Sequence, residues 1–431
     1  MQTASKKVVN GWAMYDWANS VYNLVITTTF FPAYYAAVTS TKNFPDGIRF
    51  FGRRYVNTEV KDYVMSLSFL VVVLLIPILS SIADYKGNKK NYMRFFAYIG
   101  ALSCSSMFFF DKDHVGMGLF SLFFAGIGFY GSLVFYNSYL PEIAAEKDMD
   151  RISAKGFAMG YIGSVILQII GFVLVMMMPD NEALGLKITF LLVGLWWIGF
   201  AQIPFSRLPN NAPKAERKQK KHPVIGGFHE LQKVWAQVRQ MPKLKNFLAA
   251  FFFYSMGVQT VMLVATDFGI KELKLANTKL IITLVIIQLV AIGGAYLMSK
   301  LSSMFGNLRV IIFTVVLWAG VCVAGYNITT EFHFYILAAL VGLVMGGIQA
   351  LSRATYAKFM PPTKDTASFF SFYDVTEKMA IVIGLFSFGF IEGQFGMRSS
   401  ILILMVFFAL GFIFLIVTMF KRATKTIAAT N

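Results

Sequence analysis

Cysteine and histidine are scarce in this chain of 431 residues, which has two cysteines and four histidines. Cys104 and Cys322 lie deep in separate apolar stretches, so they offer no disulfide framework, and we expect both to serve as small core residues. The histidines fall in loops or at the ends of apolar stretches, without the spacing of metal ligands and without a partnering nucleophile. The sequence therefore predicts no metal site and no enzyme built on a nucleophile and a base.

Phosphate-binding and dinucleotide-binding loops are also absent from the sequence. No GxxxxGK pattern occurs, so we do not expect ATP to act within this chain. A glycine-rich dinucleotide fingerprint is missing as well, and we expect no cofactor. Charged residues make up only 14% of the chain. An ordinary soluble domain carries about 25% charged residues, so this composition argues against a soluble globular protein.

Long apolar stretches fill most of the sequence instead. Hydrophobic residues account for 57% of the chain and aromatic residues for 16%, with a mean hydropathy of +0.61. Stretches near the spanning length of about 20 residues recur from end to end, and they lack the alternation of barrel strands. We predict an all-α polytopic membrane protein with twelve transmembrane helices, at 12–38, 62–83, 92–110, 115–140, 154–178, 186–206, 246–268, 277–299, 308–327, 333–359, 367–391 and 398–420.

The basic residues are unevenly distributed between the two sides of the predicted spans. The net charge is +17, which raises the question of nucleic acid as a partner. If the N-terminus is cytoplasmic, the cytoplasmic segments hold more than twice as many Lys and Arg as the opposite loops. This asymmetry follows the positive-inside rule, so we assign the charge to topology, with both termini in the cytoplasm and no nucleic acid bound. The first apolar run is too long for a cleaved signal core, and we expect it to remain as a span.

The longest polar interval between spans divides the chain six and six. We predict an N-terminal six-helix bundle at 1–206, a cytoplasmic basic linker at 207–245 and a C-terminal six-helix bundle at 246–431. The linker's Lys and Arg either bind anionic membrane lipids or are solvated charges that set topology. Apolar residues recur at helical spacing in its second part and predict a short interfacial helix; they are Phe228, Leu231, Val234, Trp235 and Val238.

The two halves share short sequence anchors at nearly the same offset. Gly87 and Asn88 correspond to Gly306 and Asn307, 219 residues later. A second set lies 220 residues apart and pairs Gly126, Ser132, Tyr136 and Pro141 with Gly346, Ser352, Tyr356 and Pro361. Parallel six-span halves of this kind are an arrangement used by secondary transporters.

The stretch "IADYKGNKK" (82–90) resembles the short basic loop between helices 2 and 3 of the major facilitator superfamily. Asp84 takes the acidic position, Gly87 the turn, and Lys89 and Lys90 the basic pair. The resemblance implies that the acid braces the two halves against the start of helix 11 in the outward-facing state. Ser303 stands where the second copy would have its acid, so we expect a brace on one side only.

Three further stretches narrow the resemblance. "WAMYDWANSVYNLVITTTFFP" (12–32), "FYNSYLPEIA" (135–144) and "GGIQALSRATYAKFMPP…FFSFYDVTEKMA" (346–380) look like the vacuole-effluxer branch of that superfamily, the autophagy-related transporters and their bacterial relatives. The resemblance implies two bundles around a central cavity, lined by helices 1, 4, 7 and 10, with alternating access. Members of the branch include vacuolar amino-acid exporters, and most bacterial members have no settled substrate.

The first span carries polar residues between two tryptophans. Asp16, Asn19 and Asn23 recur at intervals of three and four, which places them on one helical face. Trp12 and Trp17 suit the headgroup boundary. Asp16 is either an interface residue that braces the cytoplasmic gate, or a carboxylate that binds a cationic cargo group or a coupling proton. Both interpretations stay open at this point.

The eleventh span holds Asp374, Glu377 and Lys378 in an otherwise apolar run. Asp374 and Lys378 are i,i+4 neighbours and can neutralise one another, with Glu377 on an adjacent strip of the helix. The alternative hypothesis pairs Lys378 with Asp16, because we expect the two residues at similar depth.

Other polar residues in the predicted spans suit a small polar solute. They are Tyr136 and Asn137 in span 4, Gln259 in span 7, and Gln349 and Arg353 in span 10. Arg353 is suited to bind a carboxylate through its planar fork, but its place near the inner end of span 10 equally suits a snorkelling topology charge. Gln168 and Gln288 are expected to join helices by hydrogen bonds.

The leading hypothesis is a secondary transporter that moves a small polar solute, an amino acid or similar, by alternating access, with protons as a candidate coupling ion. Buried carboxylates such as Asp16, Asp374 or Glu377 would carry the proton. The alternatives are a transporter-like membrane sensor or scaffold without transport, and a facilitator of sugars or other solutes with the same fold. We expect a monomer in the cell (inner) membrane if the source is bacterial.

Overall fold

The computed structural model describes residues 2–50, 52–55, 59–210 and 223–421. Within these ranges, nine helices meet the length and hydropathy of a membrane span. The remaining predicted spans, at 12–38, 92–110 and 367–391, are helical but not among these nine, so the count of twelve stays a prediction. The predicted basic run of the linker falls mainly on residues 211–222, which lie outside the described residues.

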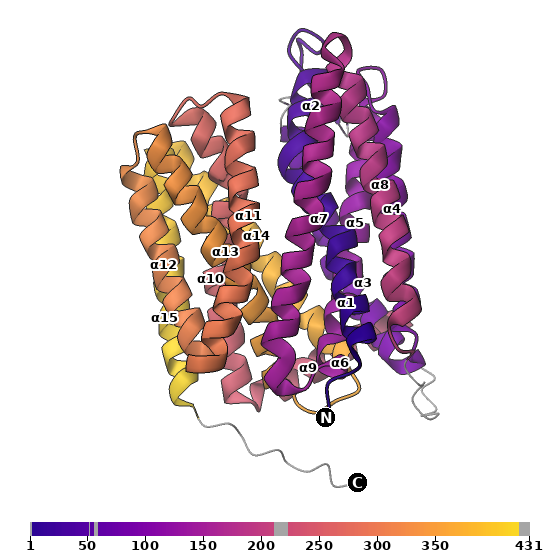
Figure 1. The fold of residues 1–431 in the computed structure, drawn as a ribbon, viewed down its shortest axis with the longest axis vertical. Helices are drawn as coiled ribbons and strands as arrows, with labels where there is room; N and C mark the ends of the chain where they lie inside the picture. The colour runs from indigo at the N-terminus through magenta and orange to yellow at the C-terminus, as the bar shows by residue number, and fades with distance from the viewer. Residues whose placement is uncertain (1, 51, 56–58, 211–222, 422–431) are drawn as a thin grey trace.

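Helices from the first half of the chain form one bundle. In Figure 1 they are drawn from indigo to magenta, side by side with the orange and yellow helices of the second half. Their apolar faces pack on one another because the spans have too few polar groups to face water. The bundle comprises α1 (Lys6–Val21), α2 (Phe31–Val38), α3 (Glu59–Lys86), α4 (Lys89–Ser106), α5 (Val115–Ser138), α7 (Met149–Met177) and α8 (Glu182–Arg207).

The second bundle follows the same plan. It comprises α10 (Pro242–Lys271), α11 (Asn277–Phe305), α12 (Asn307–Asn327), α13 (Glu331–Phe359), α14 (Thr366–Phe395) and α15 (Met397–Phe420). The sequence anchors mark equivalent packing in the two bundles. A side chain on Gly126 of α5 would meet Ser68 of α3, and one on Gly346 of α13 would meet the backbone of Ala291 in α11. Small residues at these positions let the paired helices approach closely.

Short elements complete the chain. They are α6 (Leu140–Ile143), the 3₁₀ turns Met107–Phe109, Glu146–Asp148 and Pro179–Asn181, and the antiparallel strands β1 (Ile48–Phe50) and β2 (Arg53–Tyr55). Helix α9 (Pro223–Arg239) packs along α3 and α14 (Figure 1). Val234 and Val238 of the predicted interfacial helix are buried, and the ring of Trp235 lies 5.6 Å from that of Phe372. The side chains of Phe228 and Leu231 lie outside the described part.

The first predicted span is interrupted rather than continuous. Between α1 and α2 the backbone forms a π-helical segment, Tyr22–Phe30. The hydroxyls of three consecutive threonines in this segment donate to backbone carbonyls: Thr27 to Asn23 at 2.6 Å, Thr28 to Leu24 at 2.8 Å and Thr29 to Leu24 at 2.9 Å. Such back-bonding competes with the regular ladder, and Pro32 removes a further donor just beyond it.

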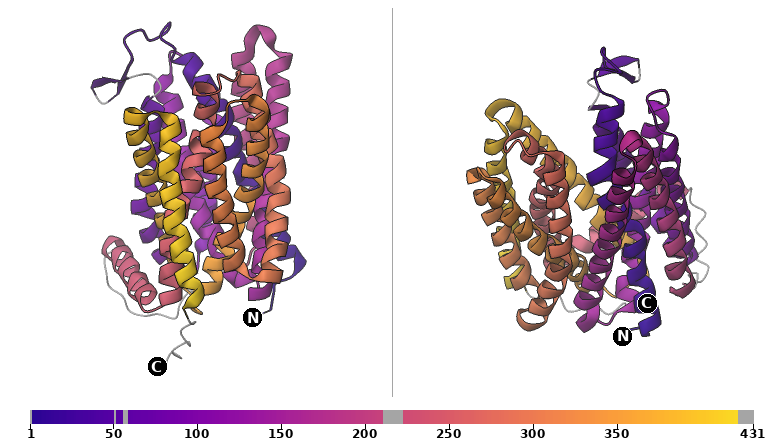
Figure 2. Two further views of the ribbon diagram at one scale, coloured as in Figure 1. Left: turned by 90° about the vertical axis from the view of Figure 1, so that its left-hand side faces the viewer. Right: turned by 45° about the horizontal axis from the view of Figure 1, so that its top comes forward.

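The two bundles meet closely near the end where the chain begins. We call this end, which carries the described start of the chain and the end of α15 at Phe420, the base, and the opposite end the top (Figures 1 and 2). Between the bundles, α7 packs on α11 and α13, and α14 packs on α3 and α5. These six helices contribute most of the polar contacts described below.

Candidate functional site

Asp16 and Arg353 form an ion pair between the two bundles. Asp16 lies on α1 and Arg353 on α13, and their side chains are 6% and 3% exposed. Both terminal nitrogens of Arg353 lie 3.4 Å from Oδ2 of Asp16, and the hydroxyl of Tyr136 donates to the same oxygen at 2.7 Å. A buried carboxylate is tolerated here because a cation and a hydroxyl donor face it.

The guanidinium of Arg353 fills a socket made by the N-terminal bundle. Nε donates to Oγ of Ser153 at 2.9 Å, one terminal nitrogen to the Ser153 carbonyl at 2.9 Å, and the other to Oδ1 of Asn137 at 3.0 Å. The rings of Trp12 and Phe157 lie 4.8 and 4.2 Å from its central carbon. A planar, delocalised cation suits such a socket of acceptors and aromatic faces.

This arrangement decides between the two interpretations of Arg353 and shows the environment of Trp12. Arg353 does not snorkel, because its side chain is buried and bonded across the bundle interface. Trp12 is fully buried within the protein: its indole donates to the carbonyl of Tyr136 at 3.0 Å, and its ring stacks on the Tyr136 ring.

The remaining polar residues of the first span do not join the ion pair. Asn19 is fully buried, and its side-chain amide has no hydrogen-bond partner among the described residues. Asn23 lies in the π-helical segment, where its Oδ1 accepts from Thr27 at 3.1 Å. The change from α to π geometry alters the angular spacing beyond Val21, so the helical periodicity used for the prediction does not extend to Asn23.

Asp84, the acidic residue of the stretch 82–90, braces the two bundles as predicted. Asp84 of α3 accepts hydrogen bonds from the backbone N–H groups of Ala367 and Ser368 at 3.2 and 2.8 Å, and from the Ser368 hydroxyl at 2.8 Å. These donors lie in the first turn of α14, where free N–H groups and the helix dipole favour an anion. The turn itself needs Gly87, whose φ of 65° lies in the left-handed region.

Lys89 and Lys90 contact different parts of the protein. Nζ of Lys89 is ion-paired with Glu142 and also lies 3.1 Å from Oγ1 of Thr366, at the start of α14. Lys90 instead donates to the carbonyl of Leu208 at 2.6 Å and stays within its own bundle. Lys89 therefore strengthens the contact between bundles, and Lys90 fixes the end of α8.

A second brace lies on the other side of the base, so the expectation of a one-sided brace is wrong. Its acid is Asp150, in the first turn of α7, and it is 6% exposed. It accepts from Ser302 at 2.9 Å, from the amide of Asn307 at 2.7 Å and from Nζ of Lys358 at 2.8 Å. Ser303 donates only within its own helix, to the carbonyl of Lys300. The carboxylate is supplied by the opposite bundle, which the local sequence of the second loop does not reveal.

The charged residues of the eleventh predicted span form a cluster on α14. Nζ of Lys378 lies 3.1 Å from Oδ1 of Asp374 and 2.9 Å from Oε2 of Glu377. The amide of Gln259 on α10 donates to Oε1 of Glu377 at 3.0 Å. The helix-internal pairing of Asp374 with Lys378 is confirmed. The alternative pairing of Lys378 with Asp16 is wrong, since Asp16 is held by Arg353.

Two glutamine contacts cross the interface above the ion pair. Gln349 of α13 accepts from the hydroxyl of Tyr161 on α7 at 2.9 Å. Gln288 of α11 donates to Gln168 of α7 at 3.0 Å, which confirms that these two amides join helices. Polar contacts between the bundles therefore continue along α7 from Asp150 to Gln168.

Comparison with known proteins identifies the family. The family described as "Vacuole effluxer Atg22 like" matches residues 4–428. The chain belongs to this family. The Atg22-like chain is 33% identical to the uncharacterized MFS-type transporter YxiO of Bacillus subtilis (strain 168), over 88% of this chain and 86% of that protein. It is 26% identical to autophagy-related protein 22-1 of Penicillium rubens, over 91% and 86% of the two chains.

A solved structure shows the same fold. The Atg22-like chain superposes on the proton:xylose symporter XylE with a TM-score of 0.73 at 11% identity, over 97% of this chain and 96% of that one. The protein is therefore an integral multi-pass membrane protein with the major facilitator superfamily transporter fold, and not an enzyme. At this identity the likeness concerns the fold alone.

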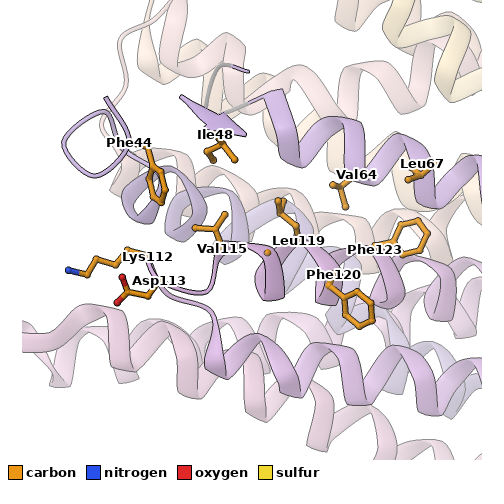
Figure 3. A pocket seen from close by; sticks show the side chains of 11 residues that line it. Phe44, Ile48, Val64, Leu67, Lys112, Asp113, Val115, Leu119, Phe120 and Phe123 are labelled. Carbon is orange, nitrogen blue, oxygen red and sulfur yellow. The ribbon is translucent and has the colours of Figure 1, made fainter. Parts of the chain in front are cut away.

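A pocket of about 580 Å³ lies elsewhere in the Atg22-like protein, towards the top of its N-terminal bundle (Figure 3). Apolar side chains of α3, α5 and the preceding loops line most of it, among them Phe44, Val64, Leu119 and Phe123, with Lys112 and Asp113 at one end. None of the residues lining this pocket contributes to the Asp16–Arg353 pair or to the α14 cluster. Size alone therefore does not select it as the functional site.

Several residues of the site were not foreseen from the sequence. Ser153, Phe157 and Asp150 all belong to α7, and Gly156 lies between them. A side chain on Gly156 would lie 2.9 Å from the Tyr136 hydroxyl and 3.0 Å from a terminal nitrogen of Arg353. The close neighbour of Gly156 is therefore the ion pair, which only the fold shows.

Proposed function

We propose that this Atg22-like protein is a secondary transporter that moves a small polar solute, an amino acid or a similar molecule, by alternating access. The Asp16–Arg353 pair carries this proposal, because it joins the two bundles at a buried position and has to break if the base opens. Alternating access requires two arrangements of the same bundles that differ by such exchangeable contacts.

The base is assigned to the cytoplasmic side of the membrane, and the membrane to the inner membrane of a bacterial cell. The loops at the base carry most of the basic residues, in agreement with the positive-inside rule. On this assignment the described arrangement is closed towards the cytoplasm, since both acidic braces and the Arg353 socket lie between the base and the middle of the bundles. The protein acts as a monomer among membrane lipids.

Proton coupling is assigned to the carboxylate of Asp16. Its partners are Arg353 from the other bundle and Tyr136 from its own. Opening of the base would withdraw Arg353 and leave a buried carboxylate without its cation. Protonation removes the free-energy cost of such an uncompensated buried charge. When the base closes again and Arg353 returns to Asp16, its positive charge would favour release of the proton from the Asp16 carboxylate.

Reconstitution into proteoliposomes tests the proposal. We expect saturable uptake and counterflow for at least one member of a panel of amino acids and sugars, and faster uptake of that solute under an inward proton gradient. Asp16→Asn should abolish the response to the gradient and retain counterflow, which needs no net driving force. Flux that ignores the gradient in the wild type would remove proton coupling from the proposal. Flux of sugars alone would show that the cargo is a sugar and not an amino acid. Absence of all flux would favour a membrane sensor or scaffold.

A further inference from the structure

The cluster on α14 carries more negative than positive charge. Its three ionisable side chains are Asp374, Glu377 and Lys378, so two carboxylates share one ammonium. In the part of the chain that the structure describes, no other Lys or Arg forms an ion pair with either carboxylate. A buried excess charge is costly in a low-dielectric interior, and proteins retain one mainly where a ligand or ion completes it.

One carboxylate oxygen of the cluster is unsatisfied. Oδ2 of Asp374 has no hydrogen-bond partner among the described residues, and Asp374 is 5% exposed. Buried polar atoms are normally paired, so this oxygen marks a place where a donor is missing. Glu377 is the most accessible of the three side chains, with 23% exposure against 6% for Asp374 and 2% for Lys378. An incoming group therefore meets Glu377 first.

An aromatic ring of the opposite bundle lies against the cluster and favours a cation. Nζ of Lys378 lies 4.6 Å from the ring centre of Tyr130, which belongs to the opposite bundle. The faces of tyrosine rings attract ammonium groups, and attract them more strongly when both are removed from water.

The buried cations near the middle of the bundles are already engaged. Arg353 is bonded to Asp16, Asn137 and Ser153, and its side chain is 3% exposed. Lys378 is held by its two carboxylates. In the described arrangement an anionic solute would find no free cation there, whereas a cationic group would meet an accessible carboxylate.

We propose that Asp374 and Glu377 form the binding site for an ammonium group of the transported solute, and that the protein prefers solutes of net charge +1 to neutral or anionic solutes of the same size. This inference rests on the proposed transport function and specifies its substrate class. Gln259 acts as a positioning residue, since its amide donor holds one oxygen of Glu377.

Three amino acids with the same six-carbon skeleton test the charge preference: L-lysine, L-norleucine and L-2-aminoadipate. Thermal stabilisation of the purified full-length protein in detergent would be measured against the concentration of each. We expect lysine to reach half-maximal stabilisation at a concentration about tenfold lower than norleucine, which corresponds to about 1.4 kcal/mol, and aminoadipate to be the weakest. Equal effects of the three, or no stabilisation by lysine at millimolar concentrations, would overturn the proposal.

Glu377→Gln should reduce the preference for lysine over norleucine to less than about twofold, because glutamine keeps the size of the side chain and removes the charge. The matched control is Glu392→Gln on the same helix. Glu392 is 27% exposed and ion-paired with Lys271 at 2.9 Å. This control should keep the wild-type preference, and an equal loss in both variants would contradict a local site.

A second variant covers the case in which Glu377→Gln does not fold. Asp374→Asn retains an oxygen that can accept from Lys378 and should also reduce the preference for lysine. The binding assay needs no flux, so charge-ordered binding without transport would refute the proposed function and keep the ammonium site. Transport without a charge preference in binding would support the proposed function and refute the ammonium site. If Glu377→Gln keeps the preference for lysine but loses the response to a proton gradient, Glu377 is a proton site and the inference is wrong.

Discussion

Arg353 on α13 reaches into the opposite bundle and lies 3.4 Å from the carboxylate of Asp16 on α1. The two residues are 337 positions apart in the chain, and each is nearly excluded from solvent. The hydrogen bonds of Arg353 to Ser153 and Asn137 and its contacts with the rings of Trp12 and Phe157 also reach the N-terminal bundle, so this one side chain makes several contacts between the two halves of the protein. The predictions that follow concern this link and the contacts around it.

Arg353→Ala should destabilise the protein by about 3–5 kcal/mol, because it leaves Asp16 buried without a cation. The double variant Asp16→Ala/Arg353→Ala should lose less than the sum of the two single variants, with a coupling free energy of about 1–3 kcal/mol. The measurement is the free energy of unfolding in a denaturing-detergent titration. Arg353→Lys should rescue little, since an ammonium cannot reproduce the bonds to Ser153 and Asn137. Additive losses would show that the pair contributes no coupling.

Gly156→Val should weaken closure of the base and cost about 1–3 kcal/mol through overpacking. The added side chain would press on the Tyr136 hydroxyl and on Arg353. Transport and melting temperature are the measurements. Gly199→Val on α8 is the control, because no atom lies within 4 Å of a side chain built there. Equal losses at the two glycines would mean that valine harms any span and that the ion pair is not the cause.

Asp84→Ala and Asp150→Ala should each shift the protein towards a conformation with an open base, and the double variant should shift it further. Each carboxylate accepts three hydrogen bonds from the opposite bundle, and bonds to charged groups contribute about 1.5–3 kcal/mol apiece. Spin labels at the exposed positions Arg151 and Ser303 would report the distance between the bundles.

The matched control for the two braces is Asp180→Asn, at an exposed turn near the top. It should leave the label distances unchanged. Unchanged distances in Asp84→Ala would show that the N-terminal brace does not hold the base closed. Unchanged label distances in Asp150→Ala alone would show that only Asp84 braces the base, as the loop sequences predict.

Lys378→Met should be strongly destabilising, by about 3–5 kcal/mol, because two carboxylates then remain buried without a counterion. The triple variant Asp374→Asn/Glu377→Gln/Lys378→Met should recover most of this loss, since the whole charged cluster is removed. Unfolding midpoints of the single and triple variants are the comparison. A triple variant as unstable as the single one would mean that packing of the Lys378 stem, and not charge, sets the cost.

The bracing contact of Asp84 and the Asp374–Lys378 pair on α14 could be predicted because each follows from a short stretch of sequence. Asp84 stands near the end of α3, in a stretch whose pattern resembles that of a known superfamily, and its donors are the first N–H groups of a helix, which any helix provides. Asp374 and Lys378 are neighbours by helical periodicity alone. In both cases the spacing along the sequence fixes the spacing in space.

The second brace shows where such local reasoning stops. Near the end of α11, Ser303 stands in the acidic position, and the sequence there indicates no brace. Asp150 supplies the carboxylate from α7, which is separated from Asn307 by 157 residues. No local periodicity connects these residues, because their distance depends on how the bundles dock. The π-helical segment was missed for a related reason, since threonine back-bonding is one of several backbone arrangements that the same residues allow.

The sequence by itself determined that the chain crosses the membrane as apolar helices and that one half carries a bracing acid. These properties follow from hydropathy, period and short motifs, each of which acts over a few turns of helix. Only the tertiary structure decided which charges meet. It paired Asp16 with Arg353 and not with Lys378, and it left Glu377 as the accessible carboxylate. The physical reason is that a buried charge takes the best-placed partner in space, and that placement is set by the packing of whole helices.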